Sequence, residues 1–153
     1  MRKSLALLLL SLVPIGFTAC SNDNNEPAPQ TVSTPDPVGN LVSLKTGTIA
    51  PQNGTPTRGT LALVRDNQNQ EFVQLNMDFT SDFHTGTVTV YLAKADTPLG
   101  TQRTAAASNV KAVSFVNKNG KQYLRLDGSS AGFSHLVFYC ETAEINFGAA
   151  PLQ

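Results

Sequence analysis

One cysteine is the residue whose type and setting most invite a chemical interpretation. Cys140 ends the run HLVFYC, residues 135–140. In an extended strand, Leu136, Phe138 and Cys140 share one face. Such a thiol can pack in the core as a small hydrophobe. If it is partly exposed near positive charge, it can instead serve as a redox group.

Other side chains would have to assist that thiol. No Lys or Arg is close to it in the sequence, so an activating charge would come from Arg125 or Lys121 across the fold. The two histidines, His84 and His135, would give a mixed nitrogen and sulfur set for a metal or a haem. Their spacing matches no compact ligand motif, and His135 and Cys140 face opposite ways in a strand. The sequence therefore predicts no metal site.

No complete catalytic set is present. Ser129 and Ser130 lie in a loop without the G-x-S-x-G elbow of serine hydrolases. Asp78 and Asp82 are expected on a solvated strand face and in a turn, whereas a glycosidase needs two carboxylates in one cleft. The chain also lacks P-loop, GxGxxG and CxxC motifs. These absences favour a protein that is not an enzyme, although they leave the question open.

The start of the chain has the features of an export signal. MRKSLALLLLSLVPIGFTAC combines a basic start with an apolar run too short to span a bilayer. Its end, FTAC, resembles the lipobox of bacterial lipoproteins, whose cysteine is acylated after cleavage. Residues 1–19 are then a lipoprotein signal peptide. Acylated Cys20 would anchor the protein in a bilayer of the cell envelope, with the outer membrane or cell surface favoured. The alternative is ordinary signal-peptidase cleavage, which leaves Cys20 free.

A polar segment separates this anchor from the expected domain. Residues 20–39 are rich in Asn, Pro, Ser and Thr, with almost nothing to bury, which predicts a disordered tether. The folded domain is expected over residues 40–153. The whole chain has a formal net charge of zero, which gives no electrostatic reason to expect a nucleic-acid partner.

The domain alternates in the manner of short strands separated by turns. In residues 71–80, the side chains of Val73, Met77 and Phe79 face one way, and residues 87–93 repeat this period of two. Strands are predicted over residues 41–50, 60–66, 71–80, 87–93, 110–116, 122–128, 135–140 and 144–148. This spacing predicts an all-β fold, an antiparallel β-sandwich of about seven to nine short strands.

Three further features refine this prediction. Residues 135–140 are apolar on both faces, as in a central strand. The Asn-Gly pair within residues 117–121 predicts a tight hairpin turn, and residues 96–109 are irregular with at most one short helical turn. Polar side chains on the outer strand faces could bind a glycan or peptide, although they are also ordinary sheet surface: Gln74, Asn76, Thr87, Thr89, Tyr91, Tyr123 and Arg125.

Three blocks of this sequence resemble a known family. They are FVQLNMDFTSDFHTGTVTVYLAK, NVKAVSFVNKNGKQYLRL and FSHLVFYCETAEINFGAAPL. Together they resemble the DM-thirteen domain, from about Gly47 to Leu152. The most specific part is the aromatic strand that reaches Cys140, followed by INFGAAPL. The HTGTVTVYL segment departs from the Gly-Pro-Asp-like turn that the family usually has before this strand.

The resemblance implies a β-sandwich with a redox or electron-transfer role for Cys140. The cysteine would act as a bare thiol or as the ligand of a haem or another redox group, towards an envelope or redox partner that the sequence does not identify. The residues alone leave an alternative. In it the domain is a non-enzymatic binding or adhesion module of the envelope, and Cys140 is a buried core thiol.

Overall fold

A computed structural model describes residues 35–153. The predicted signal peptide, Cys20 and most of the predicted tether lie outside these residues. Within the described part, no helix has the length and apolar character needed to cross a membrane.

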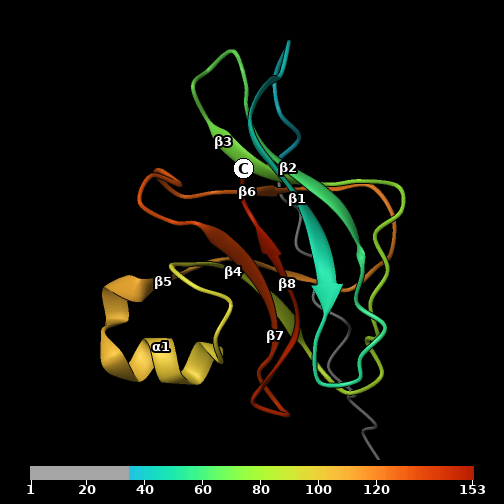
Figure 1. Cartoon of the computed structure of the whole chain (residues 1–153). Coiled ribbons are helices and arrows are strands. Elements are labelled where there is room, and N and C mark those ends of the chain that lie inside the picture. Colours follow the sequence, from blue (N-terminus) through green and yellow to red (C-terminus); the bar gives the residue numbers. More distant parts are fainter. Residues whose placement is uncertain (1–34) are drawn as a thin grey trace, which may run out of the picture. The chain divides into compact units, whose positions relative to one another are not determined.

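The regular structure of the described chain is mostly antiparallel strands, as predicted (Figure 1). The strands are β1 (Val42–Pro51), β2 (Gly59–Arg65), β3 (Glu71–Leu75), β4 (Val88–Ala93), β5 (Val110–Val116), β6 (Gln122–Arg125), β7 (His135–Cys140) and β8 (Ile145–Pro151). Each of the eight predicted segments overlaps one of them. Their hydrogen-bonded order is β5-β4-β7-β8-β1-β2-β3-β6.

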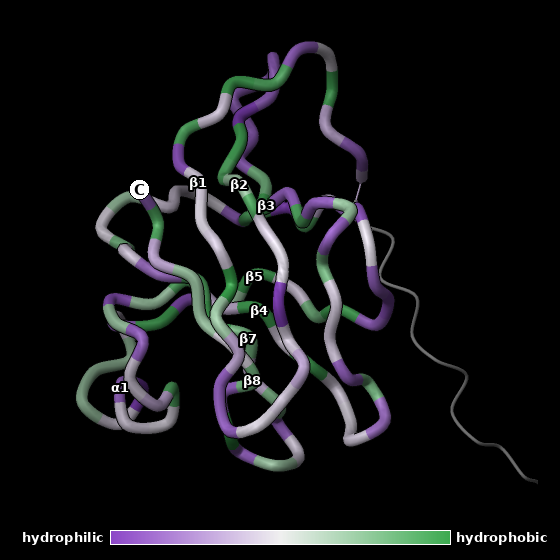
Figure 2. The backbone as a smooth tube through the Cα atoms, turned by 45° about the vertical axis from the view of Figure 1, so that its right-hand side comes forward, coloured by the Kyte–Doolittle hydropathy of each residue, from purple (hydrophilic) through white to green (hydrophobic). Residues whose placement is uncertain are grey.

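Strand β1 joins the two layers of the structure. Its residues from Val42 to Ile49 pair with β2, whereas Ala50 and Pro51 pair with β8. One layer is therefore β6-β3-β2-β1 and the other is β8-β7-β4-β5. Hydrophobic stretches gather on the strands and hydrophilic ones on the loops between them (Figure 2).

Alternate side chains from both layers form one apolar core. The predicted inward residues of β4, Val88, Val90 and Leu92, are all fully buried. Strand β7 lies between β4 and β8, and its residues are buried on both faces, which confirms the predicted central strand. The main core contains Ile49, Leu61, Leu63, Val73, Leu75, Phe79, Val88, Val90, Leu92, Val116, Leu124, Leu126, Leu136, Phe138, Cys140, Phe147, Ala150 and Leu152.

The predicted strand over residues 71–80 is too long. Strand β3 ends at Leu75, and the Met77 side chain is 77% exposed rather than inward. The reason is a turn in which the Phe79 amide donates to the carbonyl of Asn76 at 3.1 Å. This turn removes one step of the alternation and still returns Phe79 to the core.

The predicted hairpin at residues 117–121 is a corner between layers. Gly120 has the expected positive φ, 83°. The flanking strands, however, pair elsewhere: β5 pairs with β4, and β6 with β3. The corner is fixed by the β3–β4 loop instead, because the Gly120 amide donates to the carbonyl of Phe79 and Asn119 accepts from the Ser81 amide.

The stretch 96–109 holds more helix than predicted. Helix α1 (Leu99–Ala105) is followed by a 3₁₀ turn, η1 (Ala107–Asn109). Only Leu99 and Gln102 of α1 are buried, so the helix has no apolar stripe that the sequence could reveal. Leu99 packs with Val137 and Tyr139, so α1 lies over the face of β7 that points away from the main core.

The N-terminal edge of the domain is held by one carboxylate. Asp66 Oδ2 accepts a hydrogen bond from the Val38 amide at 3.1 Å, and its Oδ1 accepts from the amides of Gln68 and Gln70 at 2.9 Å. Desolvation of this carboxyl is the largest single influence and raises its pKa, but the three backbone bonds together with the charge of Arg125 outweigh it, so the pKa of Asp66 is lowered. The Asn67 amide also donates to the Val38 carbonyl. Ordered bonding thus begins two residues before the expected start of the domain at Asn40.

Candidate functional site

The candidate thiol lies at the end of the central strand. In the ladders on either side, Cys140 is opposite Val88 of β4 and Ile145 of β8. Its side chain is 0% exposed and belongs to the main core. Its Sγ lies 3.8 Å from the carbonyl oxygen of Thr85, a weak contact in which the thiol is the donor.

The surroundings of Cys140 are apolar, as the strand pattern predicts. Leu136 and Phe138 share its face and are fully buried, and the Phe138 ring stacks on Phe79 with 5.4 Å between centroids. Such packing does not fit a haem or a metal bound to the sulfur. The two candidate cations are engaged elsewhere: Lys121 Nζ lies over the Tyr123 ring, and Arg125 Nε is 3.9 Å from Asp127.

Cys140 is covered on one side by the β3–β4 loop, residues 76–87. This loop supplies Thr85, whose carbonyl contacts the thiol, and Phe83, which packs partly buried against the core. The loop is otherwise turned to solvent near its tip, where the His84 side chain is 95% exposed. The thiol is therefore close to the edge of the sandwich, beneath a single irregular segment.

The two histidines do not join the thiol. His84 Nδ1 is 2.8 Å from Asp82 Oδ1, and its backbone amide donates to the same oxygen; this amide is the main cause of the lowered pKa of Asp82. His135 Nδ1 is 2.8 Å from the Ser134 hydroxyl. Among the described residues, no group of three or more His, Cys, Asp and Glu side chains could hold a metal ion.

The candidate serines and aspartates have structural partners. The Ser130 amide donates to Oε2 of Glu71, a buried carboxylate that also pairs with Arg65 at 2.9 Å. Asp78 Oδ1 accepts from both the amide and the hydroxyl of Thr60. Asp78 and Asp82 thus hold separate turns, and they form no shared acid–base pair.

The face of β7 opposite Cys140 holds a polar cluster that sequence reasoning did not assemble. We call Tyr91, Arg103, Tyr139 and Glu141 the tyrosine cluster. The Tyr91 hydroxyl donates to Glu141 Oε1 at 2.5 Å. Arg103 places its guanidinium carbon 5.2 Å from the Tyr91 ring centroid and 5.5 Å from that of Tyr139. An Arg103 Nη atom also lies 3.8 Å from the Glu141 oxygen that accepts the phenol hydrogen bond.

The two phenols of this cluster are held in their protonated form. Burial, followed by the hydrogen bond to Glu141, raises the pKa of Tyr91 to about 12. Burial also raises the pKa of Tyr139, whose side chain is only 5% exposed. The rings meet edge to face, with centroids 6.3 Å apart. Alternation along β7 places Tyr139 on the face opposite Cys140, but nothing in the sequence places Arg103 there.

The polar residues predicted as a binding face are divided between the layers. Gln74 lies opposite Tyr123 across β3 and β6, whereas Thr89 and Tyr91 lie on β4 in the other layer.

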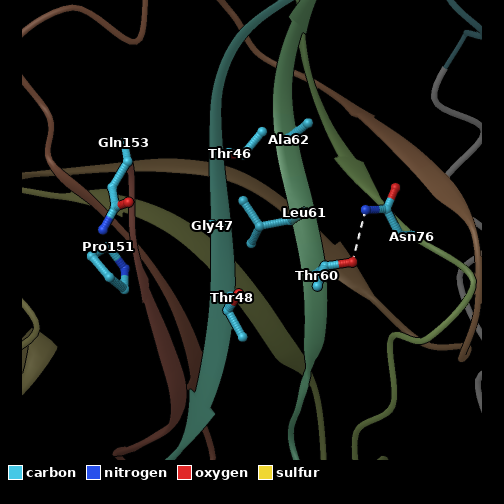
Figure 3. Close-up of a pocket in the computed structure, with 9 residues that line it drawn as sticks. All are labelled: Thr46, Gly47, Thr48, Thr60, Leu61, Ala62, Asn76, Pro151 and Gln153. Atoms are coloured by element: carbon cyan, nitrogen blue, oxygen red, sulfur yellow. Dashed lines mark hydrogen bonds between the residues drawn. The ribbon is translucent and has the colours of Figure 1, made fainter.

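A hollow of about 380 Å³ crosses β1 and β2 (Figure 3). No ionisable side chain lines it: the lining is Thr46, Gly47, Thr48, Thr60, Leu61, Ala62, Asn76, Pro151 and Gln153. The amide of Asn76 bonds the Thr60 hydroxyl along one wall (Figure 3).

A family model described as "Electron transfer DM13" matches residues 51–152, which is most of the described chain and includes both faces of β7. No curated protein and no solved structure matches the sequence.

Proposed function

Because the chain belongs to the electron-transfer DM13 family, we propose that it is a membrane-tethered electron-transfer module whose redox group is the Cys140 thiol. The step is thiol–disulfide exchange. The Cys140 thiolate attacks one sulfur of a partner disulfide, a mixed disulfide forms, and the other sulfur leaves as a thiolate. A thiol of a second molecule then attacks the partner sulfur of the mixed disulfide. This attack forms a new disulfide between that molecule and the partner and releases Cys140 as a thiolate, so the partner disulfide and the reducing thiol are the two co-reactants.

The observation that carries this proposal is the place of the thiol at the edge of the sandwich. A sealed thiol cannot exchange by contact. Cys140, however, lies at the end of β7, and its polar contact is the Thr85 carbonyl of the β3–β4 loop. Opening this loop alone would expose the sulfur, and loops open at a smaller free-energy cost than the whole domain.

The chain's start supports the membrane part of the proposal. The lipobox-like FTAC segment ends at Cys20, and acyl chains on that residue would bury in a bilayer at roughly 0.8 kcal/mol per methylene. Replacement Cys20→Ser should move the protein from the membrane fraction to the soluble fraction of the expressing bacterium. Retention of the variant on the membrane would contradict the anchor.

The rate of Cys140 alkylation at increasing urea concentrations tests the redox role. Reaction through loop opening should show a weak urea dependence, because little surface is exposed. Reaction through global unfolding should follow the full dependence of the unfolding free energy. The second outcome would contradict the proposal, because the thiol would then react only in the unfolded chain.

A glycine variant sharpens this test. Gly86 has φ +126°, and an added Cβ would lie 2.6 Å from the hydroxyl of Thr142. Gly86→Ala should strain the closed loop by roughly 1–2 kcal/mol and speed alkylation about tenfold or more. The matched control is Gly132→Ala, at φ +85° with open space around the added Cβ. It should leave the alkylation rate below the unfolding transition unchanged.

The complete burial of Cys140 favours one alternative function. In it, the thiol only packs, and the domain binds a neutral polar ligand such as a glycan in the β1–β2 hollow. Alkylation limited by global unfolding would support this alternative. Binding of a neutral oligosaccharide that Asn76→Ala abolishes, with stability retained, would then assign the hollow.

A further inference from the structure

We propose that the tyrosine cluster is a one-electron site, in which Tyr91 is oxidised while its proton moves to Glu141. The inference rests on the electron-transfer class of the protein but not on Cys140, which faces the other way from β7. Its basis is the 2.5 Å hydrogen bond from the Tyr91 hydroxyl to Oε1 of Glu141. A phenol bound this closely to a carboxylate already has its proton acceptor in place.

The step balances in atoms and electrons. Tyr91 loses one electron to a one-electron oxidant, such as a metalloprotein with a ferric haem or a cupric centre. The phenol O–H bond breaks and a new O–H bond forms on Glu141 Oε1, which leaves a neutral phenoxyl radical beside a neutral carboxylic acid. A one-electron reductant reverses both transfers. No charge is left on the ring, so the step avoids the cost of placing a cationic ring beside the Arg103 guanidinium.

Arg103 is the positioning residue of this site. It comes from α1, and its guanidinium lies over both tyrosine rings and 3.8 Å from the acceptor oxygen of Glu141. These contacts fix the ring of Tyr91 and the carboxylate of Glu141 relative to each other. They also help to hold helix α1 against the sheet, since only two of its residues are buried.

The second phenol, Tyr139, offers electrons a route from Tyr91 towards the interior. Tyr91 is partly exposed, so a partner can approach its ring, whereas Tyr139 is buried beneath it at 6.3 Å between centroids. Tyr139 is also the residue before Cys140. The chain has no Trp and three Tyr residues. The remaining tyrosine, Tyr123, lies in the other layer, where Lys121 covers its ring.

The experiment oxidises the full-length chain with hexachloroiridate(IV) at neutral pH, in a Cys140→Ala background that removes the thiol as a competing donor. Stopped-flow absorbance gives the rate, and freeze-quenched electron paramagnetic resonance identifies the radical. Four proteins are compared: the background chain, Tyr91→Phe, Glu141→Gln and the control Tyr123→Phe. Glutamine keeps a hydrogen-bond acceptor at position 141, so circular dichroism should show an unchanged fold. Unlike the carboxylate, however, it cannot accept the proton.

The background chain should give a tyrosyl radical, with a rate that falls in D₂O because a proton moves in the step. Tyr91→Phe should abolish formation of this radical, and Tyr123→Phe should leave its rate of formation unchanged. Glu141→Gln should slow it by roughly 10²-fold, the usual contribution of a positioned base, and remove the solvent isotope effect. A merely structural role for Glu141 would leave the isotope effect in place.

Two outcomes would overturn the inference, and they differ in what they say about the electron-transfer function. If a radical forms at the same rate in Tyr91→Phe or Glu141→Gln, the protein still transfers electrons, but the tyrosine cluster is not the site. If no protein of the series reacts, and the Cys140 thiol also alkylates only on global unfolding, both the inference and the proposed electron-transfer function fail.

Discussion

The two faces of β7 are both buried, but in different chemical surroundings. On one face, Leu136, Phe138 and Cys140 enter an apolar core that fills the space between the layers. On the other face, Val137 and Tyr139 are also buried, but the tyrosine lies against the guanidinium of Arg103. Alternation along a single strand has therefore separated a thiol without charged neighbours from a phenol that lies among charged groups.

This difference sets what each face can do. The thiol on the apolar face needs a conformational change before it can react, because no path to solvent exists in the closed structure. On the polar face, Tyr91 needs no such change, since its side chain is partly exposed and its hydroxyl already donates to Glu141. The first face would respond to loop opening and the second to the approach of an oxidant.

The largest expected effect is on the apolar face. Phe138→Ala removes a fully buried ring that stacks on Phe79. It should lower the free energy of unfolding by about 3–5 kcal/mol, through lost transfer energy and the cavity left behind. Urea denaturation followed by circular dichroism measures this. Tyr139→Phe, which removes only a hydroxyl from the opposite face, is the matched control and should cost much less; equal losses would break the comparison.

A smaller effect tests how fully the thiol is sealed. Cys140→Ser places a hydroxyl where the Thr85 carbonyl, 3.8 Å from the present sulfur, is too far to accept a good hydrogen bond. The change should cost about 1–3 kcal/mol of unfolding free energy. Cys140→Ala, which buries no polar group, should cost less. If the serine and alanine variants have the same free energy of unfolding, water reaches position 140 and the thiol is not sealed in the core.

The smallest effect is a pH dependence that belongs to the polar face. The pKa of Tyr91 is raised to about 12 from an ordinary value of 10.0. Because the fold favours the protonated phenol, its contribution to stability is complete below pH 10 and is lost as the pH rises towards 12. Tyr91→Phe should make the melting temperature less sensitive to pH in this window. Tyr123→Phe should leave the wild-type slope unchanged; if both variants behave alike, the shift does not arise at Tyr91.

The sequence predicted the strands well because a half-buried strand alternates apolar and polar residues with a period of two. The alternating apolar residues Val88, Val90 and Leu92 predict a strand with these three side chains in the core, and all three are fully buried. The errors arose where hydrogen bonds outside the strand ladders overrode the period of two. Met77 leaves the pattern because a turn closes at Asn76, and the Asn-Gly corner near Gly120 is held by Phe79 from another loop.

The candidate site was only partly within reach of the sequence. Alternation places Cys140 with Leu136 and Phe138, so its apolar side could be predicted, but the loop that covers it could not. The tyrosine cluster joins residues 50 positions apart in Tyr91 and Glu141. It also needs Arg103 from a helix whose buried positions are one Leu and one Gln. No local pattern encodes such a contact, because it depends on how the helix packs against the sheet.

The bond between Val38 and Asp66 has a mechanical consequence. Any tension that reaches the domain from its N-terminal side is first borne by the amide of Val38 on the Asp66 carboxylate and by the Asn67 bond to the Val38 carbonyl. These contacts would give way before strand β1 is peeled from β2. Their rupture would detach only a few residues from the domain and leave the layered interior intact.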